Sequence, residues 1–187
     1  MYRYLSLLFI VALGSAGVLL TNGDFEADLS VGWTAAFQGE LSTDTIDRAV
    51  SYNPDPDYEV RVKKYDATSA KLFQTVYIPT TDLQFSVDVS LYAYEYTPSE
   101  IYWAQAAVVL YYLDNNDNFL GQTRICHNSP HCPYTNSSTF HMIQVATPST
   151  WYNYTFNLSD ELPNLPGVNP SDIAKIQVAL YDTTDGC

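Results

Sequence analysis

Short segments rich in β-branched and aromatic residues make up this chain, and clusters of Pro, Asn, Asp and Gly separate them. Such clusters end regular elements, because Pro lacks an N–H and Asn, Asp and Gly accept turn geometries. No long run has the 3.6-residue period of an amphipathic helix. The pattern therefore predicts an all-β fold. We expect strands over residues 19–26, 32–37, 58–62, 72–78, 83–96, 102–113, 152–158 and 175–181.

Alternation with a period of two residues is clearest in the strand expected over residues 83–96. Aliphatic residues occupy every second position there, and they should face the core. These residues are Val87, Val89, Leu91 and Ala93. In the strand expected over residues 102–113, the core-facing set is Ala104, Ala106, Val108, Leu110 and Tyr112.

The alternate positions of these two strands carry aromatic and polar side chains. An antiparallel pairing through residues 97–101 would bring them together on one non-core face. Aromatic rings stack on the CH faces of sugars, and amides and carboxylates bond hydroxyls. Alternatively, the same rings pack under a loop or against the other sheet. The candidate ligand-binding residues are Asp88, Tyr92, Tyr94, Tyr96, Trp103 and Gln105.

The chain is strongly acidic, with 8 Lys and Arg against 21 Asp and Glu and a net charge of -13 over 187 residues. This charge repels phosphate backbones, so a nucleic-acid partner is excluded. The length fits one domain with a full core, which we place at residues 18–187.

Residues 1–17 have the three zones of a secretory signal peptide. Arg3 precedes an apolar run over residues 5–13, and small residues over 14–17 offer a cleavage site after Ala16 or Gly17. The alternative is an uncleaved anchor, but the apolar run is shorter than the roughly 20 residues that span a membrane. We therefore expect a secreted or cell-surface protein without a membrane span after cleavage.

Export also governs the interpretation of Cys126-His-Asn-Ser-Pro-His-Cys132. Two thiols and two imidazoles within seven positions resemble a zinc site, but in an oxidising compartment such cysteines more often form a disulfide. We predict a Cys126–Cys132 disulfide, which leaves Cys187 for another partner. Glycosylation sequons begin at Asn136, Asn153 and Asn157.

The run Asp114-Asn-Asn-Asp-Asn118 has oxygen ligands at alternate positions, as calcium loops do. However, Phe119 stands where an EF-hand needs Gly, and Ile125 stands where it needs the bidentate Glu. We expect a solvated hairpin turn here, with Leu120 and Gly121 in the returning strand.

Several segments resemble carbohydrate-binding modules of families four, nine and twenty-two. The opening Leu19-Leu-Thr-Asn-Gly-Asp-Phe-Glu26 followed by Gly32-Trp33 is the distinctive part. Leu72-Phe-Gln-Thr-Val-Tyr-Ile-Pro79 and Leu83-Gln-Phe-Ser-Val-Asp-Val89 follow in matching order. The resemblance implies a β-sandwich jelly roll of the galactose-binding-like type that binds polysaccharide on a sheet face or at loop tips.

Members of this group often hold a structural calcium ion, and by position the Asp24 carbonyl and the Glu26 carboxylate would be ligands here. They also carry a final strand with a Tyr-Ile-Asp-like motif beside the first strand. No such motif precedes Cys187, so either the sequence is truncated before this strand or the edge of the sheet is closed differently.

The leading functional hypothesis is non-catalytic binding of a polysaccharide or glycan. The alternative is a structural or adhesive β-sandwich that contacts protein partners. A glycoside hydrolase is a third possibility, but the Glu-x-Asp-x-x-Glu run of laminarinase-type enzymes is absent from the sequence, and we find no readable catalytic triad. We therefore expect no enzymatic activity.

The leader hypothesis makes a direct prediction. The exported protein should begin near Val18, because signal peptidase cuts after small residues that follow an apolar run. N-terminal sequencing of the secreted product measures this. An exported product that retains Met1 would contradict cleavage.

Overall fold

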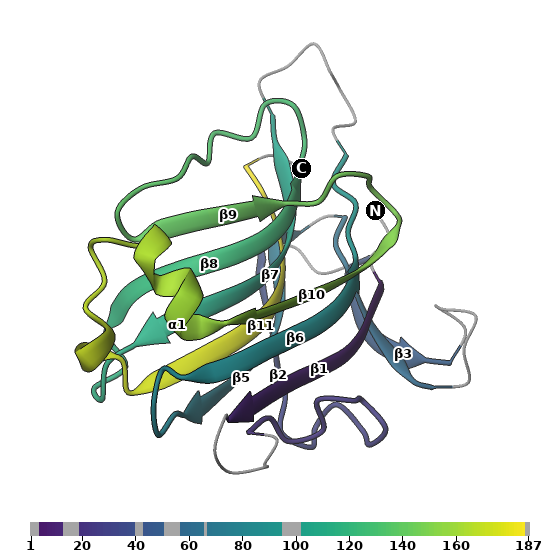
Figure 1. Cartoon of the computed structure of the whole chain (residues 1–187). Coiled ribbons are helices and arrows are strands. Elements are labelled where there is room, and N and C mark those ends of the chain that lie inside the picture. The colour runs from purple at the N-terminus through teal and green to yellow at the C-terminus, as the bar shows by residue number, and fades with distance from the viewer. Residues whose placement is uncertain are drawn as a thin grey trace.

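The computed structural model describes residues 4–12, 19–39, 43–50, 57–65, 67–94 and 102–185, and these form two β-sheets packed face to face (Figure 1). The predicted all-β sandwich is thereby confirmed. The larger sheet has six strands in the order β2-β5-β11-β7-β8-β9, and the smaller has five in the order β10-β6-β1-β4-β3.

In the six-stranded sheet, all neighbours are antiparallel except β8 and β9, which run parallel. The long strands β11 and β7 lie at its centre and pair with each other over their whole lengths. The strands of this sheet are β2 (Thr34–Gly39), β5 (Ala67–Tyr77), β11 (Lys175–Thr184), β7 (Ala104–Leu113), β8 (Phe119–Asn128) and β9 (Phe140–Gln144).

The five-stranded sheet is entirely antiparallel, and β1 lies between β6 and β4. Strand β1 falls within the segment expected to be a leader. Cleavage stays a prediction, and it would remove from β6 and β4 the partner that they share. The strands are β10 (Trp151–Asn157), β6 (Leu83–Ser90), β1 (Tyr4–Ala12), β4 (Glu59–Lys63) and β3 (Thr45–Ala49).

Both aliphatic sets predicted to face the core are buried. Every member of the set from β6 and the residues after it, Val87 to Ala93, is at most 4% exposed. The inward positions of β7, β8 and β11 pack against them in one hydrophobic cluster. Close packing of these two inner faces is the main contribution to fold stability.

The predicted pairing of residues 83–96 with residues 102–113 is wrong. Strand β6 pairs with β1 and β10 in one sheet, whereas β7 pairs with β11 and β8 in the other. Period-two alternation identifies the buried face of each strand, but it holds no information about which strand is the neighbour. The chain therefore crosses between sheets where a hairpin was expected.

Residues 19–26 form turns instead of the expected strand. The side chain of Gln74 on β5 holds this segment, because it accepts from the Thr21 N–H at 2.7 Å and donates to the Thr21 carbonyl at 2.9 Å. Gly32 lies against the same amide with φ of +88°, and a Cβ atom there would come within 2.8 Å of Gln74 Nε2. Trp33 is buried and stacks near Phe25, with ring centroids 5.2 Å apart.

The expected hairpin turn over residues 114–118 is confirmed between β7 and β8. Asp114 Oδ1 accepts the N–H groups of Asn116 and Asn118, both at 2.8 Å. After β10, the short helices α1 (Leu158–Glu161), η1 (Leu162–Asn164) and η2 (Pro170–Asp172) lead to β11. None of the helices in the described part of the chain is long and apolar enough to cross a membrane.

The two hydrogen bonds between the Gln74 side chain and the Thr21 backbone can be tested by substitution. Gln74→Leu should lower the free energy of unfolding by about 1–3 kcal/mol, because it leaves a backbone donor and acceptor of Thr21 without their protein partner. Thermal unfolding should show a fall in Tm of several degrees. The control, Gln38→Leu on the exposed strand β2, should leave Tm nearly unchanged. Equal Tm values for both variants would show that the hydrogen bonds of Gln74 to Thr21 do not stabilise the fold.

Candidate functional site

The outer face of the six-stranded sheet has a floor of small residues. At the centre, the register brings Ala107 and Val109 of β7 beside Ala179 of β11 and Cys126 of β8. All four side chains are at most 2% exposed although they point away from the sandwich core. Something on the outer face must therefore cover them.

A layer of half-buried aromatic rings covers this floor. We call this set the ring layer, and each of its residues comes from a different element of the sheet or from the loop before β9. Because the rings are only half-buried, part of each ring's surface remains open to solvent. The ring layer consists of Phe73, Tyr111, Tyr134, Phe140 and Tyr181.

Arg124 of β8 is the centre of this layer, and it is only 6% exposed. The rings of Tyr134, Phe140 and Tyr181 surround its guanidinium, with centroids 4.7, 5.0 and 5.5 Å from Cζ. Its N–H groups donate to the amide oxygens of Gln122, at 3.1 Å, and of Gln105. Cation–π contacts and neutral amides thus stabilise a buried positive charge.

Lys71 of β5 contributes a second cation. Its Nζ lies 4.4 Å from the Phe73 ring centroid and 5.6 Å from that of Tyr111, and it donates to Gln177 Oε1 at 3.2 Å. Burial lowers the pKa of the Lys71 amine. Burial likewise raises the pKa of Tyr111 to about 12, although nearby Arg124 opposes this shift. The Tyr111 hydroxyl is therefore a neutral hydrogen-bonding group at physiological pH.

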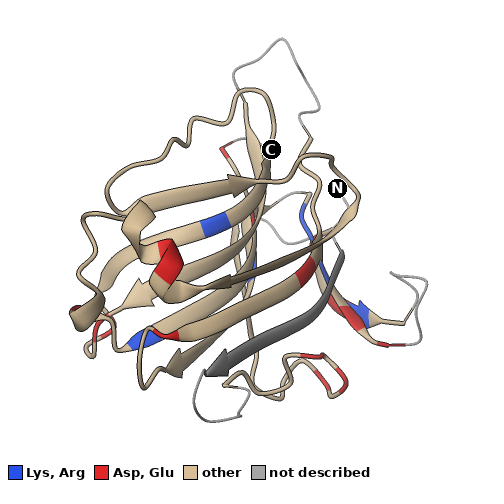
Figure 2. Ribbon diagram, in the orientation of Figure 1, with Lys and Arg blue, Asp and Glu red and all other residues tan. Residues whose placement is uncertain are grey.

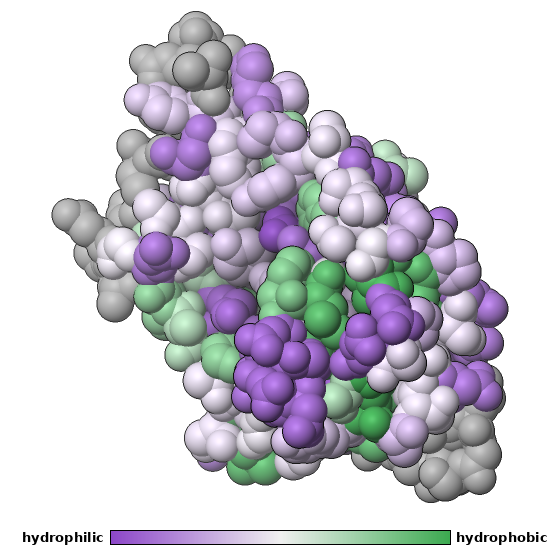
Figure 3. Space-filling model, turned by 90° about the vertical axis from the view of Figure 1, so that its left-hand side faces the viewer, coloured by the Kyte–Doolittle hydropathy of each residue, from purple (hydrophilic) through white to green (hydrophobic). Residues whose placement is uncertain are grey.

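Two of the predicted ligand-binding residues lie at this site. Trp103 packs edge-on against Tyr134, with centroids 5.0 Å apart, and so extends the ring layer. Gln105 is fully buried, and its amide joins Arg124 to Asn128. Gln105 is thus a positioning residue under the rings. In Figure 3, green apolar surface lies between groups of purple hydrophilic side chains on one side of the molecule.

The other predicted residues lie elsewhere, because β6 belongs to the other sheet. Asp88 accepts from Asn153 Nδ2 at 3.0 Å on the outer face of the five-stranded sheet. Tyr92 stacks with Tyr94 and with His127 at centroid distances of 6.2 and 6.1 Å, beyond the end of β6. Tyr96 lies outside the described residues.

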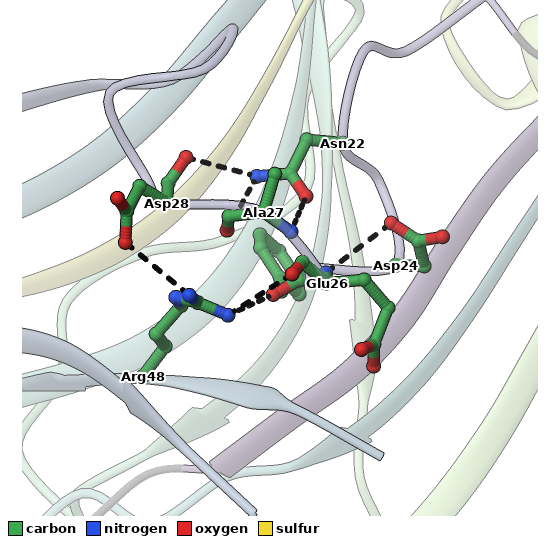
Figure 4. A network of polar contacts seen from close by, with 7 residues as sticks. Asn22, Asp24, Glu26, Ala27, Asp28 and Arg48 are labelled. Carbon is green, nitrogen blue, oxygen red and sulfur yellow. Dashed lines mark hydrogen bonds and ion pairs between the residues drawn. The ribbon is translucent and has the colours of Figure 1, made fainter.

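The opening turn forms a polar network around Arg48 of β3 (Figure 4). The guanidinium donates to the carbonyls of Phe25 and Glu26 at 3.0 and 3.3 Å and pairs with Asp28 at 3.2 Å. Glu26 Oε1 accepts the Tyr58 N–H at 2.9 Å. Arg48 thus supplies positive charge to this turn.

The calcium site expected at Asp24 and Glu26 stays a prediction. Calcium needs six to eight oxygen ligands, and the Glu26 carboxylate would have to leave the Tyr58 N–H to become one of them. Among the described residues, no group of three or more His, Cys, Asp or Glu side chains is placed to hold a metal ion.

The prediction of a Cys126–Cys132 disulfide is wrong, because no disulfide joins these two residues in the structure. Cys126 is part of the ladder of β8 and is fully buried in the floor of the site, whereas Cys132 follows the turn that closes with Ser129. Their spacing in the sequence could not reveal that a strand holds one of them. His127 points to the opposite face of β8 from Cys126, so these two do not share a metal either.

The three predicted sequons lie on or near the surface. Asn136 and Asn153 are exposed and Asn157 is half-buried. The side-chain oxygen of Asn136 accepts the Met142 N–H at 2.8 Å, and this contact can persist when the amide nitrogen carries a glycan. Glycosylation at these sites stays a prediction.

Sequence reasoning missed a buried polar network on the inner side of β8 and β9. Glu161 of α1 is 6% exposed, and its Oε1 accepts from Thr123 at 2.8 Å and lies 2.5 Å from His141 Nδ1. Its Oε2 accepts a hydrogen bond from Asn164 Nδ2 at 3.0 Å. The Tyr112 and Thr123 hydroxyls are hydrogen-bonded to each other at 3.0 Å. The network fixes α1 to the sheet. Its members lie up to 52 residues apart in the sequence, from Tyr112 to Asn164, so no local pattern signals it.

Comparison with known proteins adds no relative: no protein-family model matches the chain, and no curated protein matches it. Function must therefore be argued from the site itself.

The thiols of Cys126 and Cys132 should differ in their reactivity toward alkylating reagents. Burial raises the pKa of Cys126 to about 12, so almost no thiolate forms at pH 8 and reagents also lack access. Iodoacetamide should alkylate Cys132 in the native protein and Cys126 only after unfolding. Peptide mass mapping of both samples measures this. Equal labelling of both thiols in the native state would contradict the buried placement of Cys126.

Proposed function

We propose that this protein binds a polysaccharide or glycan without chemical turnover, through the ring layer and the bordering Trp103. The observation that carries the proposal is the combination of half-buried rings with amide and hydroxyl groups on one sheet face. Sugar rings present CH faces to aromatic rings and hydroxyls to amides. The ring layer offers both kinds of group within one surface.

The resemblance to carbohydrate-binding modules supports the same conclusion. It implies a jelly roll that binds on a sheet face or at loop tips, and the outer face of the six-stranded sheet has aromatic residues from several strands. A binding module of this kind acts at a cell surface or after secretion, which agrees with the predicted leader. The predicted calcium ion and N-linked glycans are not needed for the contacts proposed.

The proposal can be tested on single aromatic residues. Trp103→Ala and Tyr181→Ala should each weaken polysaccharide retention roughly tenfold or more, since stacking on one ring contributes about 1–3 kcal/mol. Affinity electrophoresis against a panel of neutral and acidic polysaccharides measures retention. Thermal unfolding of the same variants shows whether the fold persists.

The matched control is Tyr65→Ala, which removes an aromatic residue that is 43% exposed and contacts Lys63 of β4. This variant should bind like the wild type. Loss of binding in Tyr94→Ala alone would place the site at the end of the sandwich instead. Failure of the wild-type protein to bind any polysaccharide would reject the proposal and favour contact with protein partners.

A further inference from the structure

We infer that the glycan bound at the ring layer is anionic, with a carboxylate or sulfate ester placed at Lys71 and in the field of Arg124. This inference rests on the proposed function and specifies its ligand class. It follows from the distribution of charge over the molecule and from the partners that each cation has.

The outer face of the six-stranded sheet is a positive region on an acidic protein. Its outward strand positions hold Lys71, Arg124 and Lys175, and none of the described strands has Asp or Glu at such a position. The whole chain has 8 Lys and Arg and a net charge of -13. Figure 2 shows how sparsely Lys and Arg occur along the ribbon. Cations on a face whose strand positions hold no carboxylates favour a negatively charged ligand.

The partners of Lys71 and Arg124 differ from those of three other cations, one of which, Lys175, lies on the same face. Arg48 pairs with Asp28, Arg61 pairs with Asp47 at 2.8 Å, and Lys175 pairs with Asp117 at 2.7 Å. In the described part of the chain, Arg124 and Lys71 have rings and amide oxygens as partners and no carboxylate.

An uncompensated charge in a buried position is costly, and a bound anion lowers that cost. Arg124 is too deeply covered to touch a ligand, so its contribution is long-range. Lys71 is half-buried and lies on the same face, where its ammonium can pair directly with an anionic group. The ligand anion should therefore sit over Lys71, with Arg124 adding to the potential from beneath.

Repulsion from the rest of the acidic protein does not prevent this binding. At physiological ionic strength the screening length is about 8 Å, so charges on the opposite sheet are largely screened at the ring layer. A cation in direct contact with the ligand is screened much less. The local charge of the face thus decides the sign of the interaction.

Two pairs of polymers test the inference. Polygalacturonate and its methyl ester differ in carboxylate charge, and carrageenan and chemically desulfated carrageenan differ in sulfate esters. We expect stronger retention by the anionic member of at least one pair. Lys71→Gln should weaken that retention about fivefold, the size of one partly screened ion pair, and so lower the ratio of anionic to neutral retention. Lys71→Arg should restore it.

Lys63→Gln on β4 is the matched control, because it removes the same charge from the other sheet, and it should bind anionic polymer like the wild type. The pair that responds identifies the anion as carboxylate or sulfate. Equal retention of charged and neutral polymers, unaffected by Lys71→Gln, would overturn the anionic ligand while glycan binding stands. Absence of retention on all four polymers and on the wider neutral panel would overturn both. Thermal unfolding of each variant confirms that the fold is intact.

Discussion

Burial on both faces of the central strands β7 and β11 is the constraint on which the rest of the structure depends. Their inward residues pack in the sandwich core, and their outward residues Ala107, Val109 and Ala179 are buried as well. Small outward side chains leave room for rings from neighbouring strands to lie over them. The sheet therefore has a second apolar layer, and a sandwich with only one core would not form this site. Because three of the four floor residues belong to the two most extensively paired strands, the position of the floor is fixed by ladder hydrogen bonds.

The buried cation is a consequence of this second layer. A guanidinium tolerates such a place better than an ammonium, since its planar face stacks on rings while its edge donates to amides. Arg124 uses both properties, with rings around it and Gln105 and Gln122 at its edge. Replacing it would take a donor from both amide oxygens and the central partner from the rings. The ring layer and Arg124 thus depend on each other.

Alternation of residue types predicted the inward and outward sides of the strands, because a buried face leaves a period-two signature. It correctly assigned Val87 to Ala93 to the core and Gln105 to the opposite face of β7. Strand neighbours were not predictable, since pairing depends on contacts between distant segments. Trp103 was therefore recognised as a site candidate, but its expected partners on β6 were wrong. Tyr134 and Tyr181 come from a loop and a distant strand, and only the fold brings them together.

The edge of the site needs more support than its centre, because β9 is a five-residue strand with one neighbour. Side chains supply that support from both sides. On the inner side, Glu161 bonds Thr123 of β8 and His141 of β9, and on the outer side Asn136 accepts the Met142 N–H. The carboxylate of Glu161 is thus engaged in joining two strands, and Phe140 and Tyr134 keep their positions over Arg124 as a result. Rigid placement of these rings lowers the ordering cost of ligand binding, since the rings need not be fixed when the ligand arrives.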